Sequence, residues 1–221
     1  MADQLYLSLW YPNFRFADLP AAMLGVLGQF ARVSGLPRVA AAAAYPVSFT
    51  EPPVYQRVYV LDQRAAETPD TAASQIGPAV AEAMELLHED TAYEFEMEWR
   101  LWTPEGGAEG FDVVWRQQPF RVKFLGFGPE FDDATFEQNG QIRVDFGLDT
   151  PWVFDEDEES DAYADEDARE EAAKHIRLNV EMLLAFTLSV EKHCGISSRL
   201  LWTESGEPLG EKLIARLQRL N

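Results

Sequence analysis

The stretch Ala92–Trp102, with the sequence AYEFEMEWRLW, decides the fold class of this protein. Apolar residues alternate here with charged ones, in the order Tyr93, Glu94, Phe95, Glu96, Met97, Glu98, Trp99, Arg100 and Leu101. Because successive side chains of a β-strand point to opposite faces of its sheet, this alternation predicts a strand with one apolar face and one solvent-facing face. Such strands are typical of sheets that carry their helices on one side.

Further strands and helices are expected on both sides of this stretch. The predicted strands are residues 5–11, 39–49, 54–61, 92–102, 111–116, 120–127, 141–147 and 199–203. The predicted helices are residues 19–34, 68–88 with a kink or a restart at Gly77-Pro78, about 168–193, and 209–220. Asp18 is the expected N-cap of the first helix and Gly35 its stop. The helix over 168–193 is apolar nearly all round between Met182 and Val190, which predicts a central, buried helix.

The order of these elements predicts an α+β protein with a mixed or mainly antiparallel sheet covered by helices. A hydrophobic fraction of 47% and an aromatic fraction of 12% suffice for a well-filled core in a single domain over residues 1–221. Up to residue 102 the order is β-α-β-β-α-β, which matches a ferredoxin-like arrangement. Residues 1–103 and 110–221 are the alternative sub-structures within that domain.

The chain carries a large excess of negative charge, with 38 acidic and 18 basic residues and a formal charge of -20. Nucleic acids and anionic membranes attract basic surfaces, so this charge argues against both and favours a basic partner. No apolar run approaches the ~20 residues that a membrane helix needs. There is no basic residue before Arg15 and a single cysteine, Cys194, so we expect neither a secretory signal nor a disulfide, and a cytoplasmic location.

Half of the net charge lies between Asp155 and Glu171, which contain eleven carboxylates and one arginine. The ordinary interpretation is an acidic loop over 155–167 that leads into a helix, because carboxylates stabilise a helix N-terminus. A calcium loop is the second alternative, but Ser160 stands where an EF-hand needs glycine, so no metal site is predicted. The third is a surface for a basic protein, whose predicted partner-binding residues are Asp155, Glu156, Asp157, Glu158, Glu159 and Asp161.

The row Glu94, Glu96 and Glu98 is the strongest catalytic candidate, because alternate carboxylates on a strand lie ~7 Å apart, as in glycoside hydrolysis. The following strands present Arg121 and Lys123 on the corresponding face, so an exposed ladder of ion pairs is the favoured interpretation. Two other candidate sites are a nucleophilic cysteine in the pair His193-Cys194 and a small-ligand pocket at the strand ends near Trp102 and Trp115. The cysteine is disfavoured, because the negative end of a helix dipole raises the pKa of a thiol.

The chain contains no P-loop, dinucleotide fingerprint, G-x-S-x-G, H-E-x-x-H or C-x-x-C motif, so no catalytic residue and no cofactor is predicted. The sequence therefore predicts an acidic, cytoplasmic interaction protein, in the manner of an inhibitor or immunity protein, that binds a basic partner. The alternative is a small-ligand-binding protein or an enzyme. In that case a pocket would lie at the aromatic strand ends, with Glu94, Glu96 or Glu98 as acid or base.

Overall fold

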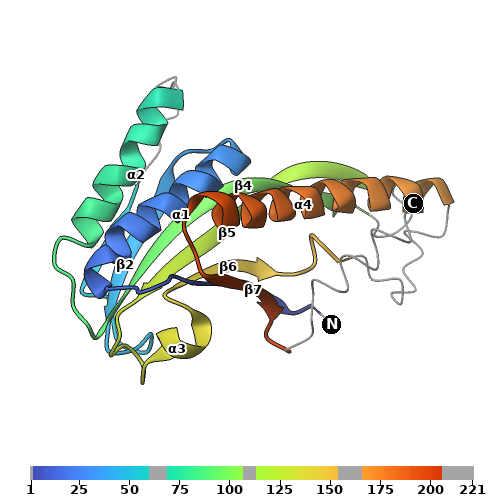
Figure 1. The fold of residues 1–221 in the computed structure, drawn as a ribbon. Coiled ribbons are helices and arrows are strands. Elements are labelled where there is room, and N and C mark those ends of the chain that lie inside the picture. Colours follow the sequence, from blue (N-terminus) through green and yellow to red (C-terminus); the bar gives the residue numbers. More distant parts are fainter. Residues whose placement is uncertain (1, 60–68, 107–112, 154–165, 206–221) are drawn as a thin grey trace.

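The computed structural model describes residues 2–59, 69–106, 113–153 and 166–205, and in them one face of a β-sheet is covered by helices (Figure 1). The strands are β1 (Gln4–Trp10), β2 (Val39–Pro46), β3 (Tyr55–Val58), β4 (Thr91–Glu105), β5 (Val114–Phe127), β6 (Ile142–Leu148) and β7 (Ser198–Thr203). The helices are α1 (Leu19–Ser34), α2 (Pro69–Ala83), α3 (Thr135–Asn139) and α4 (Glu166–His193), with a 3-10 turn at Phe16–Asp18.

The sheet has seven strands in the order β3-β2-β4-β5-β6-β1-β7, and every neighbouring pair is antiparallel. The predicted α+β class with a mainly antiparallel sheet is therefore confirmed. The ferredoxin-like arrangement is not, because β5 and β6 separate β4 from β1, which lies between β6 and β7. Strands β4, β5 and β6, which are consecutive in the chain, are also neighbours in the sheet, and β1 pairs with the far edge of β6.

The core lies between the sheet and the helices, and Trp99 of β4 is at its centre. Its ring centroid is 5.2 Å from that of Phe30 in α1, 5.5 Å from Phe146 in β6 and 5.6 Å from Trp152. Phe186 of α4 meets Phe30 edge to face at 5.4 Å. The alternation in β4 thus places its apolar residues as predicted, beneath α1 and α4 (Figure 1).

Helix α1 begins and ends at the predicted residues. Gly35 follows it in the left-handed conformation, with φ of 69°, and its N–H bonds to the carbonyl of Ala31 at 3.1 Å. Asp18 occupies the N-cap position, but its carboxylate makes no capping bond and instead accepts hydrogen bonds from the Arg15 guanidinium, the shorter at 3.1 Å. The expected side-chain cap is therefore wrong, because the nearby arginine offers a charged donor.

Two element boundaries differ from the prediction at prolines. Helix α2 is continuous through Pro78 and ends at Ala83, so the expected restart at Gly77-Pro78 does not occur and the predicted end at His88 is wrong. Strand β5 is one strand where two were expected. Pro119 lies inside it, and β6 pairs only with residues 123–126, so the missing N–H of Pro119 falls where β5 has no second described neighbour.

Helix α4 covers the sheet with one face only. Its buried side chains include Val180, Leu183 and Phe186, whereas Leu178 and Leu188 are exposed. The expectation of a central, buried helix is thus not confirmed. Helix α4 lies beside α1 on the sheet and packs against α1 and β4, and its remaining face is exposed (Figure 1). The predicted C-terminal helix over 209–220 lies outside the described residues.

Candidate functional site

Three loops that are distant in sequence meet at one end of the sheet, and we call them the acidic loop end: residues 47–54, 84–90 and 128–141. Backbone hydrogen bonds join them: Val47 N–H donates to Asp90 at 2.6 Å, Asp132 N–H to Val47 at 2.8 Å and Glu130 N–H to Glu89 at 2.8 Å. A Cβ atom on Gly128 would lie 2.3 Å from the Glu89 carbonyl oxygen, so only glycine permits this approach. The loops therefore form one surface.

This surface carries many carboxylates and no cation from its own residues. Its sequence contains neither lysine nor arginine. The acidic side chains, all exposed, are Glu51, Glu85, Glu89, Asp90, Glu130, Asp132, Asp133 and Glu137. Their like charges lie on rigidly connected loops, so the local potential is strongly negative, and a cationic group approaching this end of the sheet is attracted.

Apolar side chains accompany these carboxylates. Leu86 is 71% exposed, Val47 57% and Phe49 40%. The Phe49 ring packs edge to face on Phe131 at 4.9 Å, above a small cluster of buried residues that also contains Phe127. Val47 has a positive φ of 64°, a conformation that β-branched residues rarely adopt, so the loop holds this side chain outward against a conformational cost. The acidic loop end thus combines negative charge with a firmly supported apolar centre.

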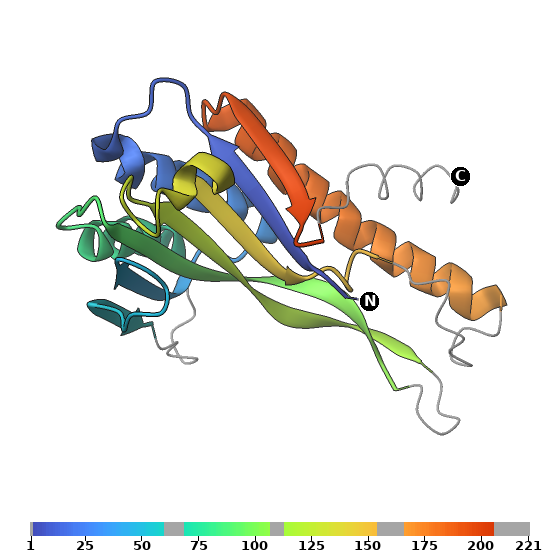
Figure 2. The same cartoon turned by 90° about the horizontal axis from the view of Figure 1, so that it is seen from below.

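The carboxylate row of β4 lies on the open face of the sheet, which no α1, α2 or α4 residue covers (Figure 2). Lys123 Nζ is 3.2 Å from Glu94 and 3.8 Å from Glu96, and Arg121 is 3.0 Å from Glu96. Arg38 reaches Glu98 at 3.3 Å. Each of the three glutamates therefore has a cationic partner, as expected for a ladder of ion pairs across neighbouring strands.

Within this ladder Glu94 is the most enclosed carboxylate. Burial raises its pKa, while the charge and hydrogen bond of Lys123 act in the opposite direction. A raised carboxyl pKa is also a property of a general acid, but the groove described below has none of the three glutamates in its lining. Glu94 thus has an ion-pair partner, and it does not line the groove in which a substrate could bind.

The aromatic strand ends do come together, around a histidine that the prediction did not connect with them. His175 of α4 lies between two indole rings, with ring centroids 4.3 Å from Trp102 and 5.2 Å from Trp115. Beside it, the buried Asn179 side chain accepts from the Trp102 N–H at 2.9 Å and donates to the Trp102 and Pro151 carbonyls at 2.9 and 2.8 Å. The imidazole of His175 therefore occupies the place between the two tryptophans where the alternative prediction put a small ligand.

The His193-Cys194 pair has the properties of a structural thiol. Burial raises the pKa of Cys194 to about 11, so the thiol stays protonated at neutral pH. The direction agrees with the one expected from the helix end, and burial is its cause here. A Cβ atom on Gly25 would lie 3.7 Å from the sulfur, which places Cys194 against α1.

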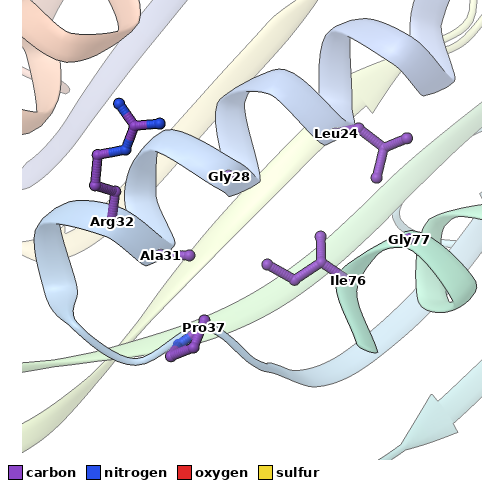
Figure 3. A pocket seen from close by; sticks show the side chains of 7 residues that line it. All are labelled: Leu24, Gly28, Ala31, Arg32, Pro37, Ile76 and Gly77. Carbon is purple, nitrogen blue, oxygen red and sulfur yellow. The ribbon is translucent and has the colours of Figure 1, made fainter. Parts of the chain in front are cut away.

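A groove with a volume of about 530 Å³ lies between α1 and α2 (Figure 3). Leu24 and Ile76 point into the space between the helices, whereas Arg32 points away from it. The remaining lining residues are Gly28, Ala31, Pro37 and Gly77, so the groove contains no acid, base or nucleophile. The groove could therefore bind an apolar group, but it contains no side chain that could catalyse a reaction.

The predicted partner-binding residues all lie outside the described residues: Asp155, Glu156, Asp157, Glu158, Glu159 and Asp161. The acidic loop end was missed because its carboxylates are distributed over three separate segments. The absence of lysine and arginine from residues 128–141 was the available signal. In the described part of the chain no cluster of three histidine, cysteine, aspartate or glutamate residues suits a metal ion, and no helix there is long and apolar enough to span a membrane.

Comparisons of the chain with protein-family models, with curated proteins and with solved structures each find no match.

Proposed function

We propose that this protein is a non-enzymatic interaction protein that binds a basic partner protein, in the manner of an inhibitor or immunity protein. The observation that carries the proposal is the acidic loop end, where eight exposed carboxylates and three exposed apolar side chains share loops that are joined by backbone hydrogen bonds and contain no lysine or arginine. The chain's formal charge of -20 acts in the same direction. The segment 155–161 stays in the proposal as a second contact region, on the strength of its sequence.

Each part of the acidic loop end has a distinct role in such binding. The carboxylates steer a cationic protein toward this end of the sheet, which raises the association rate at low ionic strength. Charge alone gives weak and non-selective contact, so the apolar side chains matter as well. Val47, Phe49 and Leu86 offer the desolvated centre that tight interfaces use, with the carboxylates as its polar rim. No reacting side chain is required.

The experiment compares three versions of the full chain as bait for proteins from source-cell lysate, at low and at high salt. The loop-end variant carries Glu89→Gln, Asp132→Asn, Asp133→Asn and Glu137→Gln. Asp132 and Asp133 have positive φ angles, and asparagine adopts these readily, so the loop backbone is preserved. The control variant removes the same number of solvent-accessible carboxylates away from both the acidic loop end and the acidic stretch 155–171, through Asp18→Asn, Glu181→Gln, Glu191→Gln and Glu204→Gln.

The wild type should retain a basic protein at low salt and release it at high salt. The association rate of the captured protein should fall at least tenfold, in order of magnitude, for the loop-end variant and change little for the control. Equal rates for the wild type and the loop-end variant would remove the acidic loop end from the proposal. Capture of nothing by the wild type at either salt would contradict the interaction role altogether.

A further inference from the structure

Arg143 of β6 has an unusual position on the open face of the sheet. Its guanidinium carbon lies 5.2 Å from the centre of the Tyr6 ring and 5.3 Å from the centre of the Phe127 ring. Tyr6 in turn contacts Trp202, with ring centroids 4.6 Å apart. Phe127, Arg143, Tyr6 and Trp202 thus form a continuous row of planar groups across β5, β6, β1 and β7.

The guanidinium in this row has cation–π contacts but no oxygen partner. Its Nε atom is buried and makes no hydrogen bond, and none of the described residues forms an ion pair with Arg143. Burial lowers the pKa of Arg143, because the low-dielectric surroundings disfavour its charge. A partly dehydrated cation with unused donors is energetically costly, and an anion that accepts from those donors would remove much of that cost.

The neighbouring charged groups explain why no side chain supplies that anion. Asp145, two residues along the same strand, accepts a hydrogen bond from the Gly147 N–H at 2.9 Å. Glu94 and Glu96 are engaged by Lys123. Asp145 therefore attracts the charge of Arg143 from a distance, without a hydrogen bond or ion pair to it, and the guanidinium keeps donors for a two-point contact with a carboxylate.

We propose that Arg143 is the binding site of a small organic carboxylate with a flat apolar body. Bidentate pairing with a guanidinium matches the geometry of a carboxylate. A dianion is disfavoured, because Asp145 and the Glu94–Glu96 row lie on the same face of a chain with a formal charge of -20. The half-exposed rings of Tyr6 and Trp202, with the exposed Leu200 beyond them, provide apolar surface for the body of the ligand.

Trp202 is held ready for this contact. Its indole Nε1–H donates to the Ser8 hydroxyl at 2.9 Å, and Ser8 is fully buried on the strand between Arg143 and Leu200. The indole orientation is therefore fixed by a hydrogen bond and by the Tyr6 ring together. A site whose aromatic wall is already oriented loses little conformational entropy when a ligand binds.

The test is an NMR titration of the full chain with benzoate, following the Arg143 Nε–Hε and Trp202 indole signals at constant ionic strength. Benzamide, a neutral molecule of the same shape, and inorganic phosphate are titrated in parallel. Benzoate should shift both signals in a saturable way, benzamide should shift neither, and phosphate should bind at least tenfold more weakly, as an order of magnitude for a repelled dianion.

Three variants assign any binding to the guanidinium. Arg143→Gln removes the charge and should weaken benzoate binding at least tenfold, in order of magnitude, as expected for a charged hydrogen-bonded pair. Arg143→Lys keeps the charge without the two-point fork and should bind with intermediate affinity. Arg121→Gln changes an exposed arginine that already pairs with Glu96 and should bind as the wild type does. The indole signal of Trp202 reports whether each variant is folded.

Two results would overturn the proposal. One is the absence of a saturable shift in the wild type with benzoate, which would make the stack a purely structural feature. The other is equal benzoate affinity in the wild type and in folded Arg143→Gln or Arg143→Lys, which would place the binding elsewhere. The benzoate titration is measured without the partner protein and substitutes no residue of the acidic loop end, so the proposed partner binding can fail without affecting this result.

Discussion

Replacing Asn179 with alanine should be among the most damaging single changes in the described part of α4. The side chain is fully buried and makes three hydrogen bonds, two with the Trp102 backbone and one with the Pro151 carbonyl. It therefore connects α4 both to the end of β4 and to the turn that follows β6. Alanine removes these bonds and leaves backbone groups of Trp102 and Pro151 without a partner.

The magnitude follows from the number of bonds. Each intramolecular hydrogen bond contributes about 1 kcal/mol net, and a buried group left unsatisfied costs about 1–3 kcal/mol. Asn179→Ala should therefore lower the free energy of unfolding by about 3–5 kcal/mol. Asn179→Asp keeps the acceptor for the Trp102 N–H but turns a carboxylate toward two carbonyl oxygens, so its loss should be larger at neutral pH and smaller in acid, where the carboxyl is protonated.

Urea unfolding, followed by tryptophan fluorescence and far-UV circular dichroism, measures these changes. Arg177→Ala is the matched control on the same helix, because its exposed ion pair with Glu181 at 3.1 Å should contribute no more than about 0.5 kcal/mol. A loss below about 1 kcal/mol for Asn179→Ala would refute the reasoning, since the three hydrogen bonds of a fully buried side chain should together contribute more than that.

Two further predictions concern glycine and a buried carboxylate. Gly28→Ala should stabilise the protein by about 0.5–1 kcal/mol, because Gly28 lies inside a helix and an added Cβ would meet no atom within 4 Å. Gly140→Ala should destabilise it, because φ is +82° there and the Cβ would lie 2.5 Å from the Leu9 carbonyl oxygen. Thermal melting compares the two, and a destabilised Gly28→Ala would contradict the open space. For Glu94, burial raises the folded-state pKa above the ordinary value of 4.5. The folded protein therefore binds more protons than the unfolded one just above that pH, and the stability contributed by this group falls as the pH rises through that window. Glu94→Gln should flatten that part of the stability–pH profile in urea titrations, and an unchanged slope would show that the raised pKa is not realised.

Several elements could be predicted from the sequence because their signals are local. Helix α1 has a proline in its first turn and a glycine after its last residue, and its bounds were predicted correctly. Strand β2 was predicted in spite of its five alanines, whose propensity favours a helix. In the structure Ala42 and Ala44 are buried on the core face of β2 and the preceding Gly35 and Pro37 prevent an earlier helix from continuing, so sheet pairing overrides propensity.

Other features could not be predicted because they depend on contacts between distant residues. The sequence pattern split β5 at Pro119 and predicted a kink or a restart of α2 at Gly77-Pro78, because it does not show which backbone N–H groups a neighbouring strand or turn requires. It also placed Trp102 and Trp115 at strand ends as a ligand site, without the knowledge that α4 brings His175 between them.

The sequence by itself determined the α+β class, the two-faced character of β4 and the excess of negative charge. These are properties of composition and of side-chain periodicity, which act within a single element. Only the tertiary structure decided that β1 pairs with β6 and β7, that three loops join into the acidic loop end, and that Arg143 lies between Tyr6 and Phe127. The physical reason is that strand order and loop convergence are set by the burial of the whole sheet face against the helices, a free energy to which residues far apart in sequence contribute together.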